Sequence, residues 1–471
     1  MRRAVAVAAL VVLAAASGCG RAPELRHVVL VSLDAVGAGH VGAYGYERDT
    51  TPHLDAIADA GTLFEAAFTQ QPWTLSSHLT MATGLDPAVH GASRERAAAP
   101  GAATLSEMLQ AEGFATAAFA AERVWMHPRY GHDRGFERYE LGGSDARKNT
   151  PAIVAWLAGQ ARELARDPEH RFFLFAHFYD AHSDAKTPVP YFVPPPARDR
   201  YLPEGEPWGR RGGTGLLLQL RRSGTATPRD RDFIRAYYDA GVRYVDEHGL
   251  GVISTALREL GLERDTLLVV TSDHGEEILE HGYVLHGQPY DETIRVPLVL
   301  RGPGIPAGLR IGHLAGLVDL APTILGLLRL PPLPGAQGMD LSSLMRGAGA
   351  VRDAVFTDGV YEGERGWGSS VVADVEGRRW SYIVRVRATG ERGRRRFAVE
   401  GEGELYDLQR DPQQQSDLQA ERPQLAGQLR DRLLAWYRAN ELRAQSLAAA
   451  REHLPLGPAE AEHLRVLGYA Q

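Results

Sequence analysis

The sequence contains very little cysteine and very little lysine. Cys19 is the single cysteine among 471 residues, so no disulfide can form within the chain. Lys148 and Lys186 are the only lysines, and every other strongly basic side chain is an arginine. Neither sign of charge forms a long run, and the formal net charge is -7. Because nucleic acid binding needs a concentrated positive surface, we expect no nucleic acid partner.

The first apolar run of the chain, residues 4–16, is too short to span a bilayer as a permanent helix. It follows two arginines and leads into Ala16-Ser17-Gly18-Cys19, which is typical of a bacterial lipoprotein signal. We therefore expect residues 1–19 to be a targeting segment. The mature protein would be exported and lipid-anchored through Cys19, on the periplasmic side of the bacterial cell envelope. An ordinary secretory signal with an incidental cysteine is the alternative.

The rest of the chain alternates between apolar strand-like runs and amphipathic helical periods, as an α/β protein does. We expect a catalytic α/β domain over residues 26–345, and a smaller α+β domain over 350–471. Residues 183–230 are rich in Pro, Gly and Arg, which indicates an irregular insertion or lid. The expected helices include 52–60, 104–110, 235–260 and 423–440.

An aspartate follows each of three apolar, strand-like runs. These runs end before Asp34, before Asp180 and before the pair Asp273-His274. Such runs fit strands that are buried on both faces, and functional groups of open α/β sheets gather beyond the carboxyl ends of the strands. Three acids in these positions therefore predict a metal site. A single one would be explained as an ordinary turn residue.

A segment rich in hydroxyl groups follows the first run. Pro72-Trp73 favours an extended chain, and Thr74, Ser76 and Ser77 are good residues for the start of a helix. The N-terminus of a helix offers unpaired N–H groups and the positive end of the helix dipole, which favour a bound oxyanion. Beside a divalent metal, the Thr74 hydroxyl could ionise near neutral pH and attack phosphorus. In the alternative reading, Thr74 only caps the helix.

Several motifs together resemble the sulfatase-like branch of the alkaline phosphatase superfamily. The resemblance implies an α/β fold with a central, mostly parallel sheet flanked by helices, followed by a smaller domain with a short antiparallel sheet and a terminal helix. It also implies a hydrolase that acts on ester bonds. The motifs occur in the order of the family and include Val31–Asp34, Thr51–Asp55, Trp73–Gly84, Ser272–Glu276 and Glu404–Leu408.

Position 74 departs from the sulfatase pattern. Sulfatases carry Cys or Ser there, within Cys-x-Pro-x-Arg, and oxidise it to formylglycine, whereas a threonine cannot become that aldehyde. Ala35 replaces the second acid of the sulfatases, and their two sulfate-binding lysines have no counterpart. Phosphoethanolamine transferases and lipoteichoic acid synthases instead resemble this chain in using a threonine nucleophile.

The resemblance to this threonine branch implies a set of site residues. The metal would be zinc or manganese, or calcium if the chemistry is that of a sulfatase. Its ligands would be Asp34, Thr74, Asp273 and His274. The substrate would be held by His78, Asp180, His182 and His286. Alternatively, Asp180, His182 and His286 would complete a second metal site.

We therefore expect a metal-dependent hydrolase of phosphate or phosphonate esters, with Thr74 as the nucleophile. Its substrate would be a small anionic ester, or the headgroup of a glycan or lipid. Three alternatives stay open. These are a sulfatase, a transferase that passes the phosphoryl group to a glycan or lipid, and an inactive family member that only binds an anionic ligand.

Overall fold

The computed structural model describes residues 24–447, apart from a set of short internal gaps. Cys19 lies outside the described residues, so the structure does not test the expectation of a lipid anchor. The gaps are residues 184–186, 188, 192, 195–196, 198–199, 204–208, 360, 363–364, 367 and 391–393.

A nine-stranded sheet in the order β11-β2-β10-β6-β1-β5-β3-β4 forms the centre of the protein, with β9 paired to β2. Neighbouring strands are parallel except where β10 and β9 pair. The predicted fold class, a central and mostly parallel sheet, is confirmed. The strands are β1 (His27–Leu33), β2 (Thr62–Phe68), β3 (Phe114–Ala120), β4 (Arg138–Leu141), β5 (Arg171–Phe178), β6 (Thr266–Thr271), β9 (Arg295–Val296), β10 (Leu298–Arg301) and β11 (Leu309–Gly316).

Strand β1 lies between β5 and β6, and each of its residues is buried. Its side chains alternate between the two faces of the sheet. Val29 and Val31 pack in one hydrophobic cluster, whereas Val28 and Leu30 pack in another. The run lacks polar alternation because both faces of the strand are covered.

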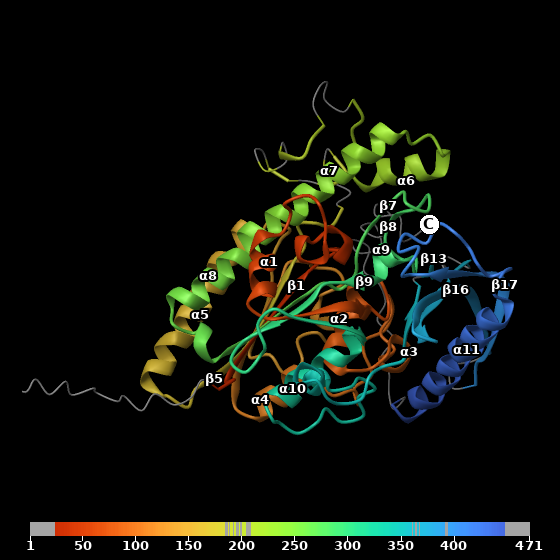
Figure 1. Ribbon diagram of the computed structural model, residues 1–471. Coiled ribbons are helices and arrows are strands. Elements are labelled where there is room, and N and C mark those ends of the chain that lie inside the picture. Colours follow the sequence, from red (N-terminus) through yellow and green to blue (C-terminus); the bar gives the residue numbers. More distant parts are fainter. Residues whose placement is uncertain are drawn as a thin grey trace, which may run out of the picture.

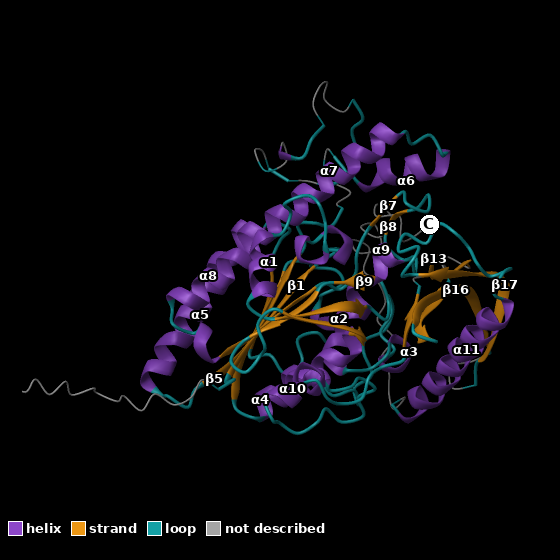
Figure 2. Cartoon of the chain, viewed as in Figure 1, coloured by secondary structure: helices purple, strands orange, loops and turns teal. Residues whose placement is uncertain are grey.

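Helices cover both faces of this sheet (Figures 1 and 2). Helices α1, α5, α7 and α8 pack against one face, and α2, α4 and α10 pack against the other. No helix among the described residues is long and apolar enough to cross a membrane. The helices are α1 (Pro52–Asp59), α2 (Thr74–Thr83), α3 (Pro87–His90), α4 (Leu105–Ala111), α5 (Ala146–Arg166), α6 (Thr214–Ser223), α7 (Pro228–Val245), α8 (Gly251–Glu259), α9 (Asp291–Ile294) and α10 (Leu320–Leu327).

A smaller antiparallel sheet in the order β12-β15-β16-β17 packs against the C-terminal helix α11 (Figure 1). Leu429 and Leu433 of α11 are fully buried against Trp380 and Leu405 of the sheet. The strands are β12 (Ala354–Asp358), β15 (Ser369–Val375), β16 (Arg378–Thr389) and β17 (Arg396–Asp407), and α11 spans Pro423–Ser446. Two short hairpins complete the structure, β7 (Glu277–Ile278) with β8 (Val284–Leu285), and β13 (Tyr361–Glu362) with β14 (Arg365–Gly366).

Candidate metal centre and nucleophile

The sheet brings Asp34, Asp273 and His274 together. Asp34 follows β1, and the other two residues follow the neighbouring parallel strand β6, so all three lie beyond the carboxyl ends of adjacent strands. One ligand atom from each residue lies within 4.8 Å of the other two. Nε2 of His274 is 3.8 Å from Oδ1 of Asp34 and 3.4 Å from Oδ2 of Asp273.

The donor atoms of this cluster fit a divalent metal. Oδ1 of Asp34, Oδ2 of Asp273 and Nε2 of His274 are buried, and they have no hydrogen-bond partner among the described residues. One buried oxygen of each carboxylate and one ring nitrogen thus lack a partner, and the resulting desolvation penalty is one that a cation would offset. Two oxygens and one nitrogen suit zinc or manganese.

The protonation states also favour metal binding. Burial lowers the pKa of His274 to about 4, so its ring is neutral at pH 7. Nδ1–H donates to the carbonyl of Gly275 at 2.8 Å, which leaves the lone pair of Nε2 directed at the carboxylates. Burial, together with the nearby Asp273 carboxylate, raises the pKa of Asp34. Burial would also raise the pKa of Asp273, but His274 and His78 lower it.

His177 orients Asp34, and the sequence interpretation missed it. This residue is fully buried near the end of β5, beside β1. Nδ1 accepts a hydrogen bond from the N–H of Ala121 at 3.3 Å, so Nε2–H can donate to Oδ2 of Asp34 at 3.0 Å. The only signal in the sequence was a polar residue within an otherwise apolar strand.

Thr74 occupies the first position of α2, and Trp73 is the N-cap. The Thr74 hydroxyl donates to Oδ2 of Asp34 at 3.3 Å, and the residue as a whole is only 1% exposed. Its side chain is therefore directed to the acidic cluster and does not cap the helix. Because no side chain caps α2, the N–H groups of its first turn remain available to an anion.

His78 lies one turn further along α2, behind Thr74. Nδ1–H donates to the carbonyl of Thr74 at 2.7 Å, and Nε2 accepts from the hydroxyl of Ser32 at 2.9 Å. The first bond lies within α2, and the second joins α2 to β1. In this arrangement the ring has no N–H left to offer a ligand, so these bonds do not support the expected substrate contact, which stays a prediction.

Asp180 contacts the start of α5 through Oδ1, whereas its Oδ2 is buried and has no hydrogen-bond partner among the described residues. Oδ1 accepts from the N–H of Ala146 at 2.9 Å, at the first residue of α5. Burial raises its pKa to about 7. Asp180 belongs to neither group of potential metal ligands found among the described residues. It supports the start of a helix because its carboxylate compensates an unpaired N–H group and the helix dipole.

His182 and His286 lie beside His274 and form a second group with it. One nitrogen of each of the three lies within 4.8 Å of the others, and the rings of His274 and His286 stack at 4.0 Å. Burial lowers the pKa of His182 to about 3 and of His286 to about 4, so both rings are neutral at pH 7. The arrangement accommodates either substrate contacts by these histidines or a second metal.

Glu276 connects this group to the insertion. It accepts a hydrogen bond from Nδ1–H of His286 at 3.1 Å and another from the hydroxyl of Tyr191 at 2.6 Å. Tyr191 belongs to the segment that was expected to be an irregular insertion or lid. That segment therefore contacts the site through a buried side chain, and Glu276 orients His286.

Known proteins share this architecture. A phosphonate monoester hydrolase of Agrobacterium radiobacter superposes with a TM-score of 0.66 at 21% identity, over 88% of this chain and 96% of that chain. At this level of identity the likeness shows the fold alone.

Curated relatives are arylsulfatases. Arylsulfatase K of Mus musculus is 29% identical over 217 residues, which are 45% of this chain and 37% of that protein. The matches to arylsulfatase K of other mammals cover even less of those proteins, 22% in Bos taurus and 23% in Homo sapiens. The arylsulfatase of Clostridium perfringens is 22% identical over 83% of this chain and 90% of that protein. The sulfatase family model matches residues 26–330, well over half of the sequence, and the chain therefore belongs to the sulfatase family.

Proposed function

We propose that the protein is a metal-dependent hydrolase of phosphate or phosphonate esters and that Thr74 is its nucleophile. The observation that carries the proposal is the position of the Thr74 hydroxyl. It lies at the uncapped start of α2, 3.3 Å from Asp34 and next to the buried Asp34, Asp273 and His274 cluster. A divalent metal at that cluster would lower the pKa of a hydroxyl and offset the charge of a bound ester.

Different groups of the site would carry out the attack on phosphorus, the stabilisation of charge and the positioning of the nucleophile. Oγ1 of Thr74 attacks phosphorus and displaces the alcohol, which gives a phosphothreonine that water hydrolyses in a second step. The N–H groups of the first turn of α2 face the negative charge that develops on the nonbridging oxygens. His182 and His286 would hold these oxygens through Nε2 only as protonated rings, because in the neutral rings Nδ1–H already donates to Ser183 and Glu276 and Nε2 keeps a lone pair, which suits a second metal. His177 and His78 keep Asp34 and α2 in position.

Hydrolysis of sulfate esters is the second candidate. Two curated relatives with long alignments are arylsulfatases and a third is an ulvan-active sulfatase, which favours this chemistry. Position 74 opposes it, because a threonine cannot supply the aldehyde hydrate through which sulfatases expel sulfate. The substrate class is an anionic ester of a glycan or lipid headgroup. One solved neighbour is described in complex with D-glucosamine-2-N,6-O-disulfate, which supports the glycan.

A panel of aryl phosphate monoesters, diesters, phosphonates and sulfates, assayed with metal analysis of the same preparation, tests the proposal. We expect turnover of a phosphorus ester and little of the aryl sulfate. Thr74→Ala should lower kcat by at least about 1,000-fold with metal retained, and Thr74→Ser should keep part of the rate, because a hydroxyl remains. A preference for the sulfate would establish the second candidate, and full activity of Thr74→Ala would remove Thr74 from the mechanism.

A further inference from the structure

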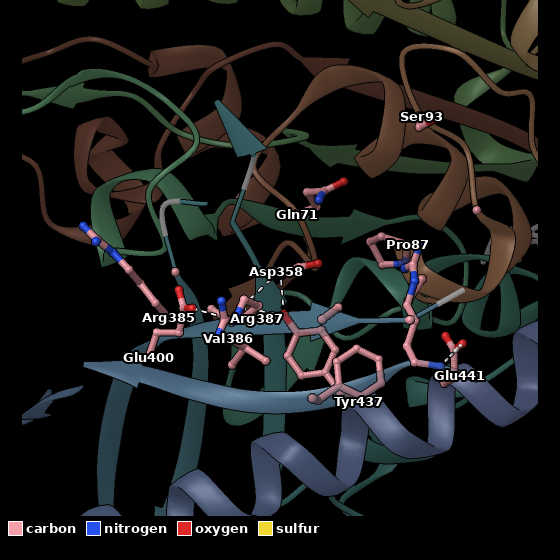
Figure 3. Close-up of a pocket in the computed structure, with 18 of the residues that line it drawn as sticks. Gln71, Pro87, Ser93, Asp358, Arg385, Val386, Arg387, Glu400, Tyr437 and Glu441 are labelled. Carbon is pink, nitrogen blue, oxygen red and sulfur yellow. Dashed lines mark hydrogen bonds and ion pairs between the residues drawn. The ribbon is translucent and has the colours of Figure 1, made fainter. Parts of the chain in front are cut away.

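A large cavity lies between the small sheet with α11 and the segment around α3, and none of the candidate metal ligands lines it (Figure 3). Its volume is about 660 Å³, and residues from α3, β16 and α11 contribute to its walls. Pockets that hold a small organic ligand commonly have volumes of about 300 to 1,000 Å³. The cavity is therefore large enough for a unit the size of a sugar.

Three arginines of this cavity form no ion pair with another described residue, although burial raises the pKa of the nearby Asp358 and the charge of Arg395 partly offsets that rise. Arg96 comes from the loop after α3, Arg385 from β16, and Arg395 immediately precedes β17. Among the described residues, none of these three guanidinium groups makes a hydrogen bond or an ion pair. A fourth arginine, Arg387, is paired with Glu400 at 2.7 Å, as the dashed line in Figure 3 shows.

The acidic side chains of the cavity are all engaged. Asp358 is buried and accepts hydrogen bonds from Ser369 at 3.1 Å and from the hydroxyl of Tyr437 at 2.6 Å. Glu400 pairs with Arg387, and Glu441 accepts from the backbone N–H of Arg395 at 3.2 Å. Among the described residues that line the cavity, four arginines stand against three acidic side chains, so this part of the lining carries a formal charge of +1. A bound anion would lower the electrostatic energy of the arginines.

The cavity also has an apolar wall. The ring of Phe397 stacks on Tyr437 with 4.9 Å between the ring centroids, and Val386 and Pro87 line the cavity as well. A sugar ring presents C–H groups to such a surface. A guanidinium binds a sulfate or carboxylate through two parallel hydrogen bonds. The combination of apolar wall and arginines matches an acidic sugar better than a bare inorganic anion.

One wall of the cavity is continuous with the segment that leads to the nucleophile. Gln71 lines the cavity and lies three residues before Thr74. The N–H of Asp358 donates to the carbonyl of Gln70 at 2.9 Å, and the hydroxyl of Thr357 donates to the carbonyl of Thr69 at 2.6 Å. The wall of the cavity is therefore hydrogen-bonded to the segment that precedes Thr74.

We propose that this cavity is a subsite for an acidic sugar unit, bearing a sulfate or carboxylate group, of the same glycan whose ester is cleaved at Thr74. The proposal deepens the function given above and rests on it in one respect, namely that the substrate is a glycan. It assigns the specificity for a charged chain to Arg96, Arg385 and Arg395.

Binding can be measured apart from catalysis with the full-length Thr74→Ala protein. The probes are a sulfated hexasaccharide from heparin and a hexasaccharide of galacturonic acid, with maltohexaose as the neutral reference, titrated by calorimetry. We expect at least one acidic probe to bind more tightly than maltohexaose. Adding Arg385→Ala or Arg395→Ala should weaken that binding about tenfold, since a charge-assisted hydrogen bond contributes about 1.5 kcal/mol or more.

Arg396→Ala is the matched control, because it removes the same charge one residue from Arg395 and outside the cavity wall. It should change the dissociation constant less than twofold. A loss equal to that of Arg395→Ala, or no preference for either acidic probe over maltohexaose, would overturn the subsite. Unfolding midpoints should be unchanged in all three variants.

The same variants, made in the wild-type background, separate this proposal from the proposed reaction. Arg385→Ala should lower the turnover of an acidic glycan ester more than that of a small aryl ester, because only the glycan spans the cavity, and equal losses on both substrates would contradict a separate subsite. If the wild type cleaves no ester of the panel but the acidic probe still binds through Arg385 and Arg395, the hydrolase function is wrong and the acidic-sugar site stands.

Discussion

At the candidate metal centre, backbone N–H groups bind one oxygen of the Asp273 carboxylate and leave the other oxygen available to a metal. Oδ1 of Asp273 accepts from the N–H of Ala35 at 3.2 Å and from the N–H of His274 at 2.9 Å, so only Oδ2 lacks a partner. Ala35 has a φ of +60°, an uncommon value for a residue with a side chain. Such strain persists where the surroundings impose it, and here it aims an N–H at a candidate metal ligand.

Replacement of Asp273 by Asn should abolish tight metal binding. The change removes one of two anionic donors, and we expect the affinity to fall by more than the about 10- to 100-fold that follows loss of a supporting residue. Metal content after dialysis, measured by mass spectrometry, gives the readout. Asp180→Asn is the control, because Asp180 supports the start of α5 and should leave metal content unchanged. Equal metal loss in both variants would place the site elsewhere.

The candidate ligands could be predicted from the sequence because each directly follows an apolar run, and parallel strands end at one edge of the sheet. Their supporting residues could not. His177 is one residue of a buried run, and its contact with Asp34 depends on β5 lying next to β1, although the two are more than a hundred residues apart. His78 has the spacing of a site residue, but its bonds to Ser32 and Thr74 appear only when α2 has docked.

For the helices too, local sequence patterns predicted the elements, whereas contacts between segments far apart in the chain were missed. The helix expected over residues 235–260 begins earlier, at Pro228, where Thr227 and Asp230 form a capping box. It is also interrupted by a π-helical turn at Asp246–Leu250. Asp246 of that turn accepts from the N–H groups of His53 and Leu54, and so caps α1. Thr51, the residue directly before α1, makes no capping bond, and its hydroxyl instead donates to Asp55.

The turn after β6 holds His274 in place and tolerates no side chain at Gly275. A Cβ atom there would lie 2.0 Å from the carbonyl oxygen of Glu292 and 2.9 Å from Cα of Gly37, and both contacts are backbone. We expect Gly275→Ala to lower the free energy of unfolding by about 2 kcal/mol or more, as overpacking does, and to displace His274. Urea unfolding and metal content measure the two effects.

Gly39→Ala is the matched control for this turn, since a Cβ at Gly39 meets nothing within 4 Å. It should leave stability within about 0.5 kcal/mol of the wild type and metal content unchanged. Equal stability of the two variants would show that the turn can relax without cost.

In the molecule as a whole, the second sheet is joined to the first beside the nucleophile. Arg352 pairs with Asp319, which also accepts from the N–H groups of Gly316 and Met339. Val355 and Val372 pack against Phe68 of β2, the strand that leads toward Thr74. The sequence predicted a smaller second domain but not this contact, because long-range packing leaves no periodic signal in the chain.

We propose that the mature protein is attached to the cell envelope through a lipid on Cys19. The single cysteine stands at the end of an apolar signal segment, at the position that a lipoprotein signal requires. Cys19→Ala should give a soluble or uncleaved product, measured by fractionation and by the mass of the N-terminus. Membrane partition of a cleaved Cys19→Ala protein would contradict the proposal.

The stability of the whole protein should fall in mild acid, and His27 allows one contribution to be measured. Its ring is fully buried and stacks on Phe172 at 4.2 Å, and neither nitrogen has a hydrogen-bond partner among the described residues. Burial, with help from Arg26 and His170, lowers its pKa to about 3. In the unfolded chain the pKa is about 6.5, so between these values the unfolded state binds more protons.

Stability therefore rises with pH across that window and is lost as the pH falls below about 6.5, by up to about 1.4 kcal/mol per pH unit from this residue. His27→Phe preserves the stacked ring but cannot take up a proton. Between pH 7 and pH 5, urea unfolding should show that the wild type loses about 2 kcal/mol more than this variant. The exposed His313→Gln is the control and should behave like the wild type. If His27→Phe loses stability as steeply as the wild type, the acid sensitivity comes from the other buried histidines, among them those of the metal centre.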